Sequence, residues 1–392
     1  MTKLQREREQ AIQAYQAQEP VAAIARRLGR SRAWVHKWIK RYQATGGGEA
    51  GLAEHSRRPR GNARQTSEEI VRAVQLTRQQ LAGQGGFRGA QIIRWELEDL
   101  GLTPLPSEST INRILRREGL CERRTEGYVP KGKPYPKLLA EQANEVQQSD
   151  FVGPCYLRGP VRFYSLNSVD VATGRCAVTP QLDKTAQSTI DGFWANWCRL
   201  GLPRHQQVDN EMVFYGSPTH PRGMGCVIRL CLAQGIEPWF IPLGEPWRNG
   251  VVEKFNDHYQ QGLLQRETLS GAEALAPASL AFEEKHNGRY RYSKLQGRTP
   301  LQALARQSAT LRFPASPESP RHPLPKPETG RYHLVRLIRS DGLLDVFSEK
   351  FRAPPEATYA YVTATIEVAT QKLQLSMDGE PYPKGWTKKW GE

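Results

Sequence analysis

Residues 246–256 read PWRNGVVEKFN, and this stretch decides how the middle of the chain folds. A proline and an aromatic residue lead into Asn249-Gly250, and the segment around them has the spacing of a helix over residues 248–260. Glu253 then lies one turn into that helix. A short apolar segment at residues 237–241 precedes it and is typical of a strand. The sequence therefore predicts a strand, a loop and a helix that carries an acidic side chain near its start.

Strands and helices also alternate upstream of this stretch. The expected elements are strands at residues 145–152, 162–170, 176–179 and 205–209 and a helix at residues 185–200. The first three strands predict a meander, with a turn at Thr173-Gly174. The order β-β-β-α-β-α-β-α predicts an α/β core with a sheet of mixed direction over residues 143–312.

Three acidic residues lie on or directly after these elements. Asp150 lies on the first strand, Asp209 follows a later strand, and Glu253 is near the start of the helix. Strand ends and helix starts on one sheet edge can bring distant side chains together, and three crowded carboxylates need a cation to remain ionised. Oxygen ligands select Mg²⁺, with Mn²⁺ as the alternative, and two such ions support phosphoryl transfer. The pattern predicts a catalytic metal site of Asp150, Asp209 and Glu253.

Three motifs carry a resemblance to a known family. The runs QSDF at residues 148–151, VDNE at residues 208–211 and PWRNGVVEKFN resemble the catalytic motifs of bacterial insertion-sequence transposases in the retroviral-integrase (DDE) superfamily. The resemblance covers roughly residues 10–300. Two features differ from the usual pattern: 43 residues separate Asp209 from Glu253, and Glu211 stands where a glycine often follows Asp-Asn.

The resemblance implies an RNase H-like catalytic core in which Asp150, Asp209 and Glu253 bind two Mg²⁺ ions. It also implies a DNA transposase, a polynucleotidyl transferase that binds the terminal repeats of a mobile element and joins them to target DNA. Its expected partners are the double-stranded DNA of the element ends and of the target. A homo-oligomer assembled on paired ends is expected for the same reason.

Two helical segments precede the core, at residues 1–45 and 62–125, and both follow the helix-turn-helix plan. As alternatives, the first segment could be a small helical bundle with a solvated basic face, and the second could form a dimer or have a purely structural role. In the first, helices are expected at residues 4–18 and 21–28, and Ser31 caps a third helix. In the second, Ser107 or Ser109 begins the last helix. The predicted DNA contacts are Arg30, Arg32, His36, Lys37, Lys40, Asn112, Arg113 and Arg116 on these segments, Arg57, Arg58 and Arg60 between them, and Asn249 and Lys254 in the core.

The charge distribution agrees with this arrangement. The net charge is +15, and residues 1–140 hold 26 Lys and Arg against 14 Asp and Glu, whereas the other 252 residues hold 29 against 26. A basic N-terminal third favours a polyanionic partner. The six cysteines form no C-x-x-C pair and the chain has no long apolar run. We therefore expect a cytoplasmic protein with no membrane partner. The resemblance further implies a bacterial protein that associates with the nucleoid when bound to DNA.

The C-terminal third predicts a smaller all-β domain. A linker is expected at residues 126–142 and a proline-rich one at residues 313–329. After it, alternating apolar residues between 330 and 378 predict a small β-barrel. The tail, KGWTKKW at residues 384–390, interleaves cations with aromatic residues and is either a nucleic-acid contact or a frayed end.

Three alternatives stay open from the sequence. Asp170 is the rival metal ligand, because it also ends a strand. Cys226 and Cys231 with His205 and His220 could be read as a zinc site, although their spacing is poor and core positions explain the cysteines better. The whole chain could be a sequence-specific DNA-binding regulator with a catalytically silent core, or a nuclease that acts on RNA hybrids.

Overall fold

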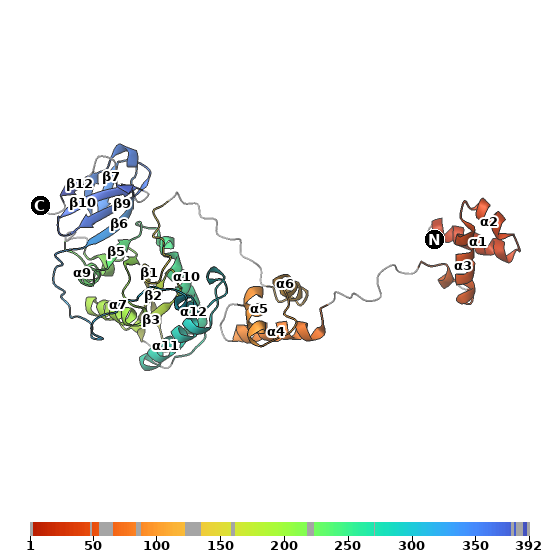
Figure 1. Ribbon diagram of the computed structural model, residues 1–392, viewed down its shortest axis with the longest axis horizontal. Coiled ribbons are helices and arrows are strands. Elements are labelled where there is room, and N and C mark those ends of the chain that lie inside the picture. Colours follow the sequence, from red (N-terminus) through yellow and green to blue (C-terminus); the bar gives the residue numbers. More distant parts are fainter. Residues whose placement is uncertain are drawn as a thin grey trace. The chain divides into compact units, whose positions relative to one another are not determined.

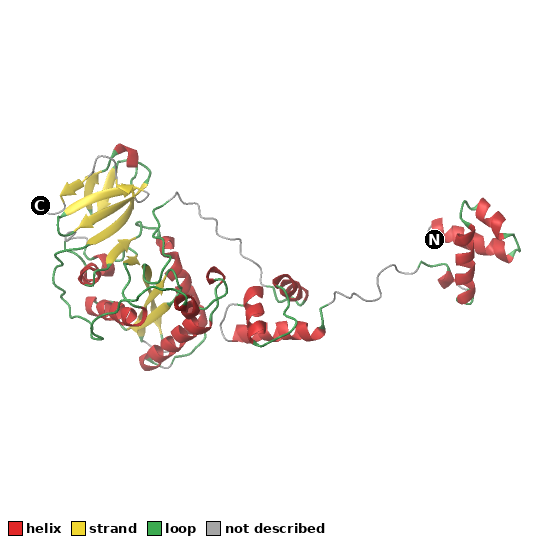
Figure 2. Cartoon of the chain, in the orientation of Figure 1, coloured by secondary structure: helices red, strands yellow, loops and turns green. Residues whose placement is uncertain are grey.

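The computed structural model describes residues 3–47, 49–54, 66–83, 88–121, 135–157, 161–217, 223–269, 271–377, 380–381 and 387–389. The chain divides into two compact units, Met1–Thr66 and Ser67–Glu392. Helices make up the first unit, and strands are frequent in the second (Figure 2). None of the described helices is long and apolar enough to cross a membrane.

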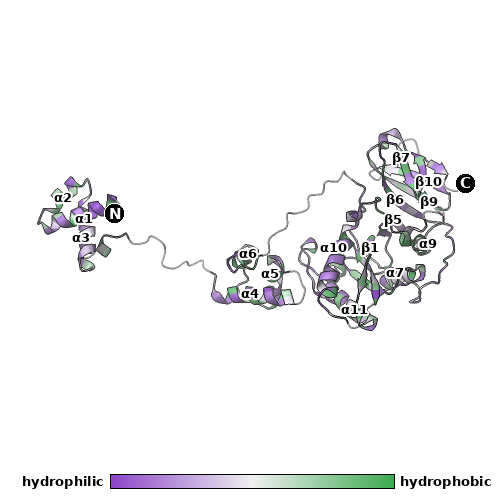
Figure 3. Cartoon of the chain, turned by 180° about the vertical axis from the view of Figure 1, so that it is seen from behind, coloured by the Kyte–Doolittle hydropathy of each residue, from purple (hydrophilic) through white to green (hydrophobic). Residues whose placement is uncertain are grey.

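The N-terminal unit is a three-helix domain. It contains α1 (Lys3–Gln16), α2 (Val21–Arg27) and α3 (Arg32–Ala44), followed by the short helix η1 (Glu49–Gly51). Ser31 caps α3 as predicted, because its hydroxyl accepts a hydrogen bond from the Trp34 amide at 3.1 Å. Ile12, Ile24 and Val35 form the core, while hydrophilic residues are frequent on the rest of the unit (Figure 3).

The second helical segment has its own apolar core. It consists of α4 (Glu68–Gly83), α5 (Ala90–Asp99) and α6 (Glu108–Arg117) (Figure 1). Ile93, Leu97 and Ile111 are buried between these helices. Ser107 is the cap of α6, since its hydroxyl accepts from the Thr110 amide at 3.2 Å. Both helical segments therefore have the predicted three-helix plan.

The α/β core is built on a sheet of mixed direction, as predicted. Three antiparallel strands, β1 (Val146–Tyr156), β2 (Arg162–Asp170) and β3 (Cys176–Gln181), form one side. On the other edge of β1, the short strands β4 (His205–Val208) and β5 (Glu237–Phe240) are added in parallel. The central strand β1 thus lies between an antiparallel half and a parallel half, and Asp150 is on it.

Helices cover both faces of this sheet (Figure 1). The connecting helices are α7 (Ala186–Leu200), α8 (Met212–Tyr215), α9 (Cys226–Ala233), η2 (Pro246–Asn249), α10 (Gly250–Tyr259), the π-helical turn η3 (Gln260–Leu264), α11 (Ala272–Arg289), η4 (Ser293–Leu295) and α12 (Pro300–Ala305). Phe193 and Trp197 of α7 pack with Leu166 on one face. Phe255 of α10 and Phe282 of α11 pack with Val178 on the other. The alternation of side chains along β1 and β2 explains why the two faces have separate cores.

The C-terminal strands extend the core sheet, and the predicted small β-barrel is not confirmed. Strand β6 (Arg331–Leu337) pairs in parallel with β5, and β9 (Tyr361–Glu367), β10 (Lys372–Met377), β11 (Glu380–Pro381) and β12 (Thr387–Lys389) follow outward. The remaining elements are a separate hairpin of β7 (Leu343–Val346) and β8 (Glu349–Arg352) and the short helix η5 (Pro355–Ala357). Among the described residues, the pairings of these strands form an open sheet and do not close it into a barrel. Alternating apolar residues fit both arrangements, so the pattern alone could not separate them.

Two buried histidines make the stability of the core depend on pH. His258 of α10 and His286 of α11 lie with their ring centroids 5.6 Å apart. Burial lowers the pKa of His258 to about 4, with a further contribution from Lys285, and lowers that of His286 to about 3. Both values lie below the ordinary value of 6.5, so the unfolded chain binds more protons between pH 6.5 and 4. These histidines therefore cost stability as the pH falls through that window.

We expect His258→Phe to remove part of this dependence. Between pH 6.5 and 4 its free energy of unfolding should fall by about 3 kcal/mol less than that of the unmodified chain. Urea unfolding at several pH values measures the difference. His322→Phe, at an exposed histidine, is the control and should follow the unmodified chain. Parallel curves for His258→Phe and the unmodified chain would contradict the prediction.

Candidate functional site

The register of the sheet places Asp150 and Asp209 side by side. Strand β1 pairs with β4 so that Gln148 lies opposite Gln207. Continuing this parallel register by two residues puts Asp150 opposite Asp209, which directly follows β4. Adjacent strands are about 4.8 Å apart, so the two carboxylates share one location on the sheet.

Helix α10 brings the third carboxylate to the same place. Glu253 lies in its first turn, and the helix is attached to β1 at its start. The side-chain carbonyl of Gln148 accepts hydrogen bonds from the amides of Val251 and Val252, at 3.0 and 3.3 Å. Free amides at a helix start need such acceptors. Gln148, two residues before Asp150, therefore sets the position of Glu253.

The charges of the three carboxylates act on one another. Burial first, and then the charge of Asp209, raises the pKa of Asp150 to about 7, and Glu253 also contributes. The pKa of Asp209 is raised, chiefly by burial. Burial, Asp257 and Asp209 raise that of Glu253. Asp150, Asp209 and Glu253, the triad predicted from the sequence, thus lie where burial and neighbouring negative charges disfavour their ionised forms. A bound cation would offset this unfavourable energy.

A chain of buried amides holds the Asp150 side chain. The Asn256 Nδ2 group donates to Asp150 Oδ2 at 2.9 Å, and the Asn167 Nδ2 group donates to Asn256 Oδ1 at 2.8 Å. The Ser165 hydroxyl donates to Asn167 Oδ1 at 2.7 Å. These groups connect β2, α10 and β1. They hold the carboxylate through its Oδ2 atom.

We expect Asn256→Ala to weaken both the fold and the site. The change leaves the buried Asn167 amide without its acceptor, which costs about 1–3 kcal/mol of unfolding free energy. It also frees the Asp150 carboxylate to rotate, so a Mg²⁺ ion should be bound there more weakly. Urea unfolding and a calorimetric titration with Mg²⁺ measure the two effects. Asp257→Ala, at the next and exposed position of α10, is the control for stability, and equal stability of the two variants would contradict the prediction.

Glu211 and Lys184 belong to the site as well, and the motifs did not indicate Lys184. The Glu211 amide donates to Asp209 Oδ1 at 2.9 Å, and its carboxylate pairs with the Lys184 ammonium. Lys184 also lies over the Phe151 ring, 4.9 Å from its centroid. Its charge lowers the pKa of Asp209, whereas the charge of Glu211 raises it. The residue that replaces the usual glycine therefore adds a fourth carboxylate, and a lysine partly offsets it.

Asn249 is buried inside the fold. Only 2% of this residue is exposed, its Nδ2 group donates to the Ser149 carbonyl at 3.0 Å, and its Oδ1 accepts from Gln207 at 3.3 Å. Asn249 was predicted to contact DNA. Its amide is instead used to join α10 to β1 and β4, because the loop before the helix passes directly over the sheet.

The rival ligands from the sequence lie apart from the triad. Asp170 is buried at the far end of β2, where it accepts from the Asn144 and Thr173 amides at 2.9 and 3.1 Å. It closes a turn. Cys231 is buried in the core, as the cysteines were expected to be, and the Cys226 thiol donates to the Val213 carbonyl. His220 lies outside the described residues.

The other predicted DNA contacts are mostly exposed. On α3 and just before it, Arg32, His36, Lys37 and Lys40 face solvent, and Arg30 pairs with Glu7 at 2.6 Å. The exposed candidates elsewhere are Asn112, Arg113 and Arg116 on α6 and Lys254 on α10. Arg57, Arg58 and Arg60 lie outside the described residues.

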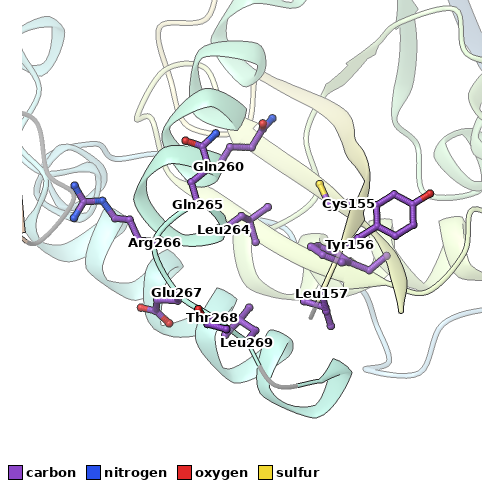
Figure 4. A pocket seen from close by; sticks show the side chains of 11 residues that line it. Cys155, Tyr156, Leu157, Gln260, Leu264, Gln265, Arg266, Glu267, Thr268 and Leu269 are labelled. Carbon is purple, nitrogen blue, oxygen red and sulfur yellow. The ribbon is translucent and has the colours of Figure 1, made fainter. Parts of the chain in front are cut away.

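A cavity opens beyond the end of β1. It has a volume of about 430 Å³ and lies between Cys155–Leu157 and the segment from Gln260 to Leu269 (Figure 4). Arg266 lines this cavity, and its guanidinium donates to the carbonyls of Ala82 and Gly83 at 2.8 and 3.1 Å. The segment after α10 therefore contacts the end of α4.

Comparisons with known proteins agree with the helical segments. Residues 2–53 match a family model described as a homeodomain-like domain, and residues 34–115 match a second model with the same description. No curated protein matches the chain. The N-terminal segments are therefore homeodomain-like helix-turn-helix domains, and they precede an α/β core with a mixed sheet.

Solved structures with some similarity include viral integrases. The HTLV-2 integrase catalytic core domain in complex with magnesium, in its trimeric form, aligns at 20% identity over 41% of this chain and 97% of that one, with a TM-score of 0.32. Its dimeric form gives 21% identity, 42% and 97% coverage and a TM-score of 0.33. The simian T-cell lymphotropic virus intasome in complex with PP2A regulatory subunit B56 gamma gives 15% identity, 76% and 92% coverage and a TM-score of 0.37.

Proposed function

We propose that this protein is a DNA transposase of the retroviral-integrase (DDE, RNase H-like) superfamily, similar to those of bacterial insertion sequences. It binds the terminal repeats of its element and hydrolyses a phosphodiester at the element end. The freed 3′-hydroxyl then attacks a phosphodiester of the target, which joins the element to the target phosphate and releases the 3′-hydroxyl of the target strand. The observation that carries the proposal is the grouping of Asp150, Asp209 and Glu253, which come from distant parts of the chain and act on one another electrostatically.

The donor set fits two Mg²⁺ ions. It consists of carboxylate oxygens, which hard divalent cations prefer. Their raised pKa values are a further reason for the fit, because an adjacent cation stabilises the ionised forms. In this proposal Asp150, held by Asn256, binds metal together with Asp209 and Glu253. Two bound Mg²⁺ ions would activate the attacking oxygen and neutralise the charge that develops on the phosphate.

The residues of the chain do the positioning. Phosphoryl transfer needs in-line placement of the attacking oxygen and charge neutralisation more than a covalent protein nucleophile. Gln148 and Asn249 fix helix α10 against β1, so the spacing of Glu253 from Asp150 does not depend on a flexible loop. Lys254 follows Glu253 and is exposed, and we propose that it contacts a DNA phosphate.

The helix-turn-helix domains supply recognition. The exposed side of α3 is basic, with Arg32, Lys37 and Lys40, as a helix in the major groove requires. We propose that the two helical segments read one terminal repeat. Two repeats are then brought together by a homo-oligomer, and the bound protein associates with the nucleoid.

The proposal is tested with purified protein and DNA that carries the terminal repeat, which is found as an inverted repeat flanking the gene. Cleavage at the repeat end and strand transfer are measured with Mg²⁺ and with EDTA. We expect both reactions with Mg²⁺, and neither with EDTA or with Asp209→Asn. Tight, specific binding without metal-dependent cutting would support a DNA-binding regulator instead. Cleavage of RNA hybrids without strand transfer would indicate a nuclease.

A further inference from the structure

A second cluster of possible metal ligands lies away from the carboxylate site. His205, Glu237 and His333 are on the neighbouring strands β4, β5 and β6. Among the described residues, they form the one group of three His, Cys, Asp or Glu side chains whose donor atoms all lie within 4.8 Å of one another. The catalytic candidates Asp150, Asp209 and Glu253 are therefore spaced more widely than this cluster.

The strand register explains why these side chains converge. His205 and Glu237 are the first residues of β4 and β5 and lie directly opposite each other. His333 lies opposite Trp239, two residues after Glu237 and hence on the same face of the sheet. The cluster is thus a row across three parallel strands, and its location follows from the backbone.

The distances suit a small ion with nitrogen and oxygen ligands. His333 Nε2 is 2.9 Å from Glu237 Oε2, and His205 Nδ1 is 3.7 Å from the same oxygen. Zn²⁺ binds imidazole and carboxylate at about 2.0–2.2 Å in tetrahedral geometry, which separates neighbouring ligand atoms by about 3.4 Å. The two observed distances lie on either side of that value. The third pair of donor atoms, on His205 and His333, lies within 4.8 Å. Side-chain rotations that bring all three pairs toward this spacing would place three ligands around Zn²⁺.

One atom of the cluster is buried without a hydrogen bond. His205 Nδ1 is shielded from solvent and has no hydrogen-bond partner among the residues that the structure describes. A buried polar atom without a hydrogen bond lowers the free energy of unfolding. Glu237 Oε2, 3.7 Å away, is hydrogen-bonded to His333 Nε2, so a shared ion would replace that bond and would also satisfy His205 Nδ1.

Neighbouring groups orient the two partners of His205. The Thr365 hydroxyl lies 2.9 Å from His333 Nδ1, on the side of the ring away from Glu237, and fixes the direction of Nε2. Arg331 donates to Glu237 Oε1 at 2.8 Å and so leaves Oε2 to the cluster. Trp239 packs on the His333 ring with centroids 4.8 Å apart. Arg331 and Arg204 carry positive charge near the cluster, which reduces its affinity for a cation.

We propose that His205, Glu237 and His333 bind one Zn²⁺ ion, which ties strand β6 to the core sheet. The site is separate from the carboxylate site, because His205 and Asp209 mark opposite ends of β4, about 13 Å apart along an extended strand. The two imidazoles favour Zn²⁺ over Mg²⁺. The proposal does not depend on the catalytic one, since it concerns the junction between the core and the C-terminal strands.

The test uses the full-length, tag-free chain stripped of metal and titrated with Zn²⁺ alone. We expect one equivalent to bind and to raise the thermal unfolding midpoint, with Mg²⁺ unable to displace it. His205→Gln and His333→Gln should each weaken Zn²⁺ binding at least about 100-fold, and Thr365→Val about 10-fold. His322→Gln, at an exposed histidine, and Asp150→Asn, in the carboxylate site, should leave it unchanged.

A second measurement needs no variant. Co²⁺ in place of Zn²⁺ should give the strong visible absorption of a four-coordinate site, and Zn²⁺ should displace it. No binding at micromolar Zn²⁺, or unchanged binding in both histidine variants, would overturn the proposal. It would equally be overturned by loss of the stoichiometric Zn²⁺ in Asp150→Asn, since the ion would then belong to the carboxylate site.

Discussion

Replacing Asp150 with asparagine is expected to reduce Mg²⁺-dependent cleavage of terminal-repeat DNA by at least about 10³-fold, because bound metal supplies several kcal/mol of transition-state stabilisation. The amide oxygen is a weaker ligand than a carboxylate, yet it still accepts the hydrogen bond from Asn256. The shape of the site should therefore persist while metal binding is lost. Strand cleavage and gel-shift measurements on the same DNA should give lost activity with unchanged binding.

The same variant should be more stable than the unmodified chain. Burial and Asp209 raise the pKa of Asp150 to about 7, so in metal-free buffer at pH 8 the folded state carries a charge that its surroundings disfavour. Removing that charge should increase the free energy of unfolding by about 1–3 kcal/mol. Asp191→Asn, at an exposed position of α7, is the control and should change neither quantity. Full Mg²⁺-dependent cleavage by Asp150→Asn would refute the catalytic assignment.

The grouping of the three acids could be anticipated from the elements that carry them, although Asp150 lies within β1 and not at its end. Asp209 directly follows β4, and Glu253 lies in the first turn of α10. Short apolar strands and a helical repeat are visible in a sequence, and the ends of neighbouring parallel strands meet at one sheet edge. The motifs distinguish these three from the rest of the 40 acidic residues.

The supporting hydrogen bonds could not be anticipated in the same way. Gln148 caps a helix more than 100 positions later in the chain, and Asn256 contacts Asp150 across a similar separation. The spacing of residues along a sequence does not show which partner a buried polar side chain will have. Asn249 illustrates this, because an asparagine before a helix suits a cap, a DNA contact or a buried link equally well, and the structure has the buried link.

The C-terminal strands show a second limit of prediction from the sequence. Alternating apolar residues predict that a strand has one buried face, but not which strand lies beside it. One edge of β5 pairs with β4 of the core. The other edge pairs with β6, at Trp239 and Phe240. The resulting sheet continues from the core into the C-terminal strands. This continuity matters for the active site, because residues of β6 reach the loop that carries Asp209.

Arg336 of β6 makes that connection. It is 5% exposed and donates to the carbonyl of Asp345 at 3.0 Å and to the Oδ1 atom of Asn210 at 3.1 Å. The Asn210 Nδ2 group in turn donates to the carbonyl of Ile241, just after β5, at 2.6 Å. A buried guanidinium therefore holds the residue next to Asp209 in one orientation. Burial lowers the pKa of Arg336 to about 10, so it remains charged at neutral pH.

Arg336→Met should consequently affect stability and catalysis together. Methionine fills much of the volume but leaves several buried carbonyl and amide oxygens without donors, which should lower the free energy of unfolding by about 3 kcal/mol. The loop after Asp209 is released at the same time, so the Mg²⁺ concentration for half-maximal cleavage should rise at a temperature where the variant is folded. Arg339→Met, an exposed arginine just after β6, is the matched control and should change neither value. If Arg336→Met loses stability but keeps the Mg²⁺ dependence of the unmodified chain, the C-terminal strands support the fold without positioning Asp209.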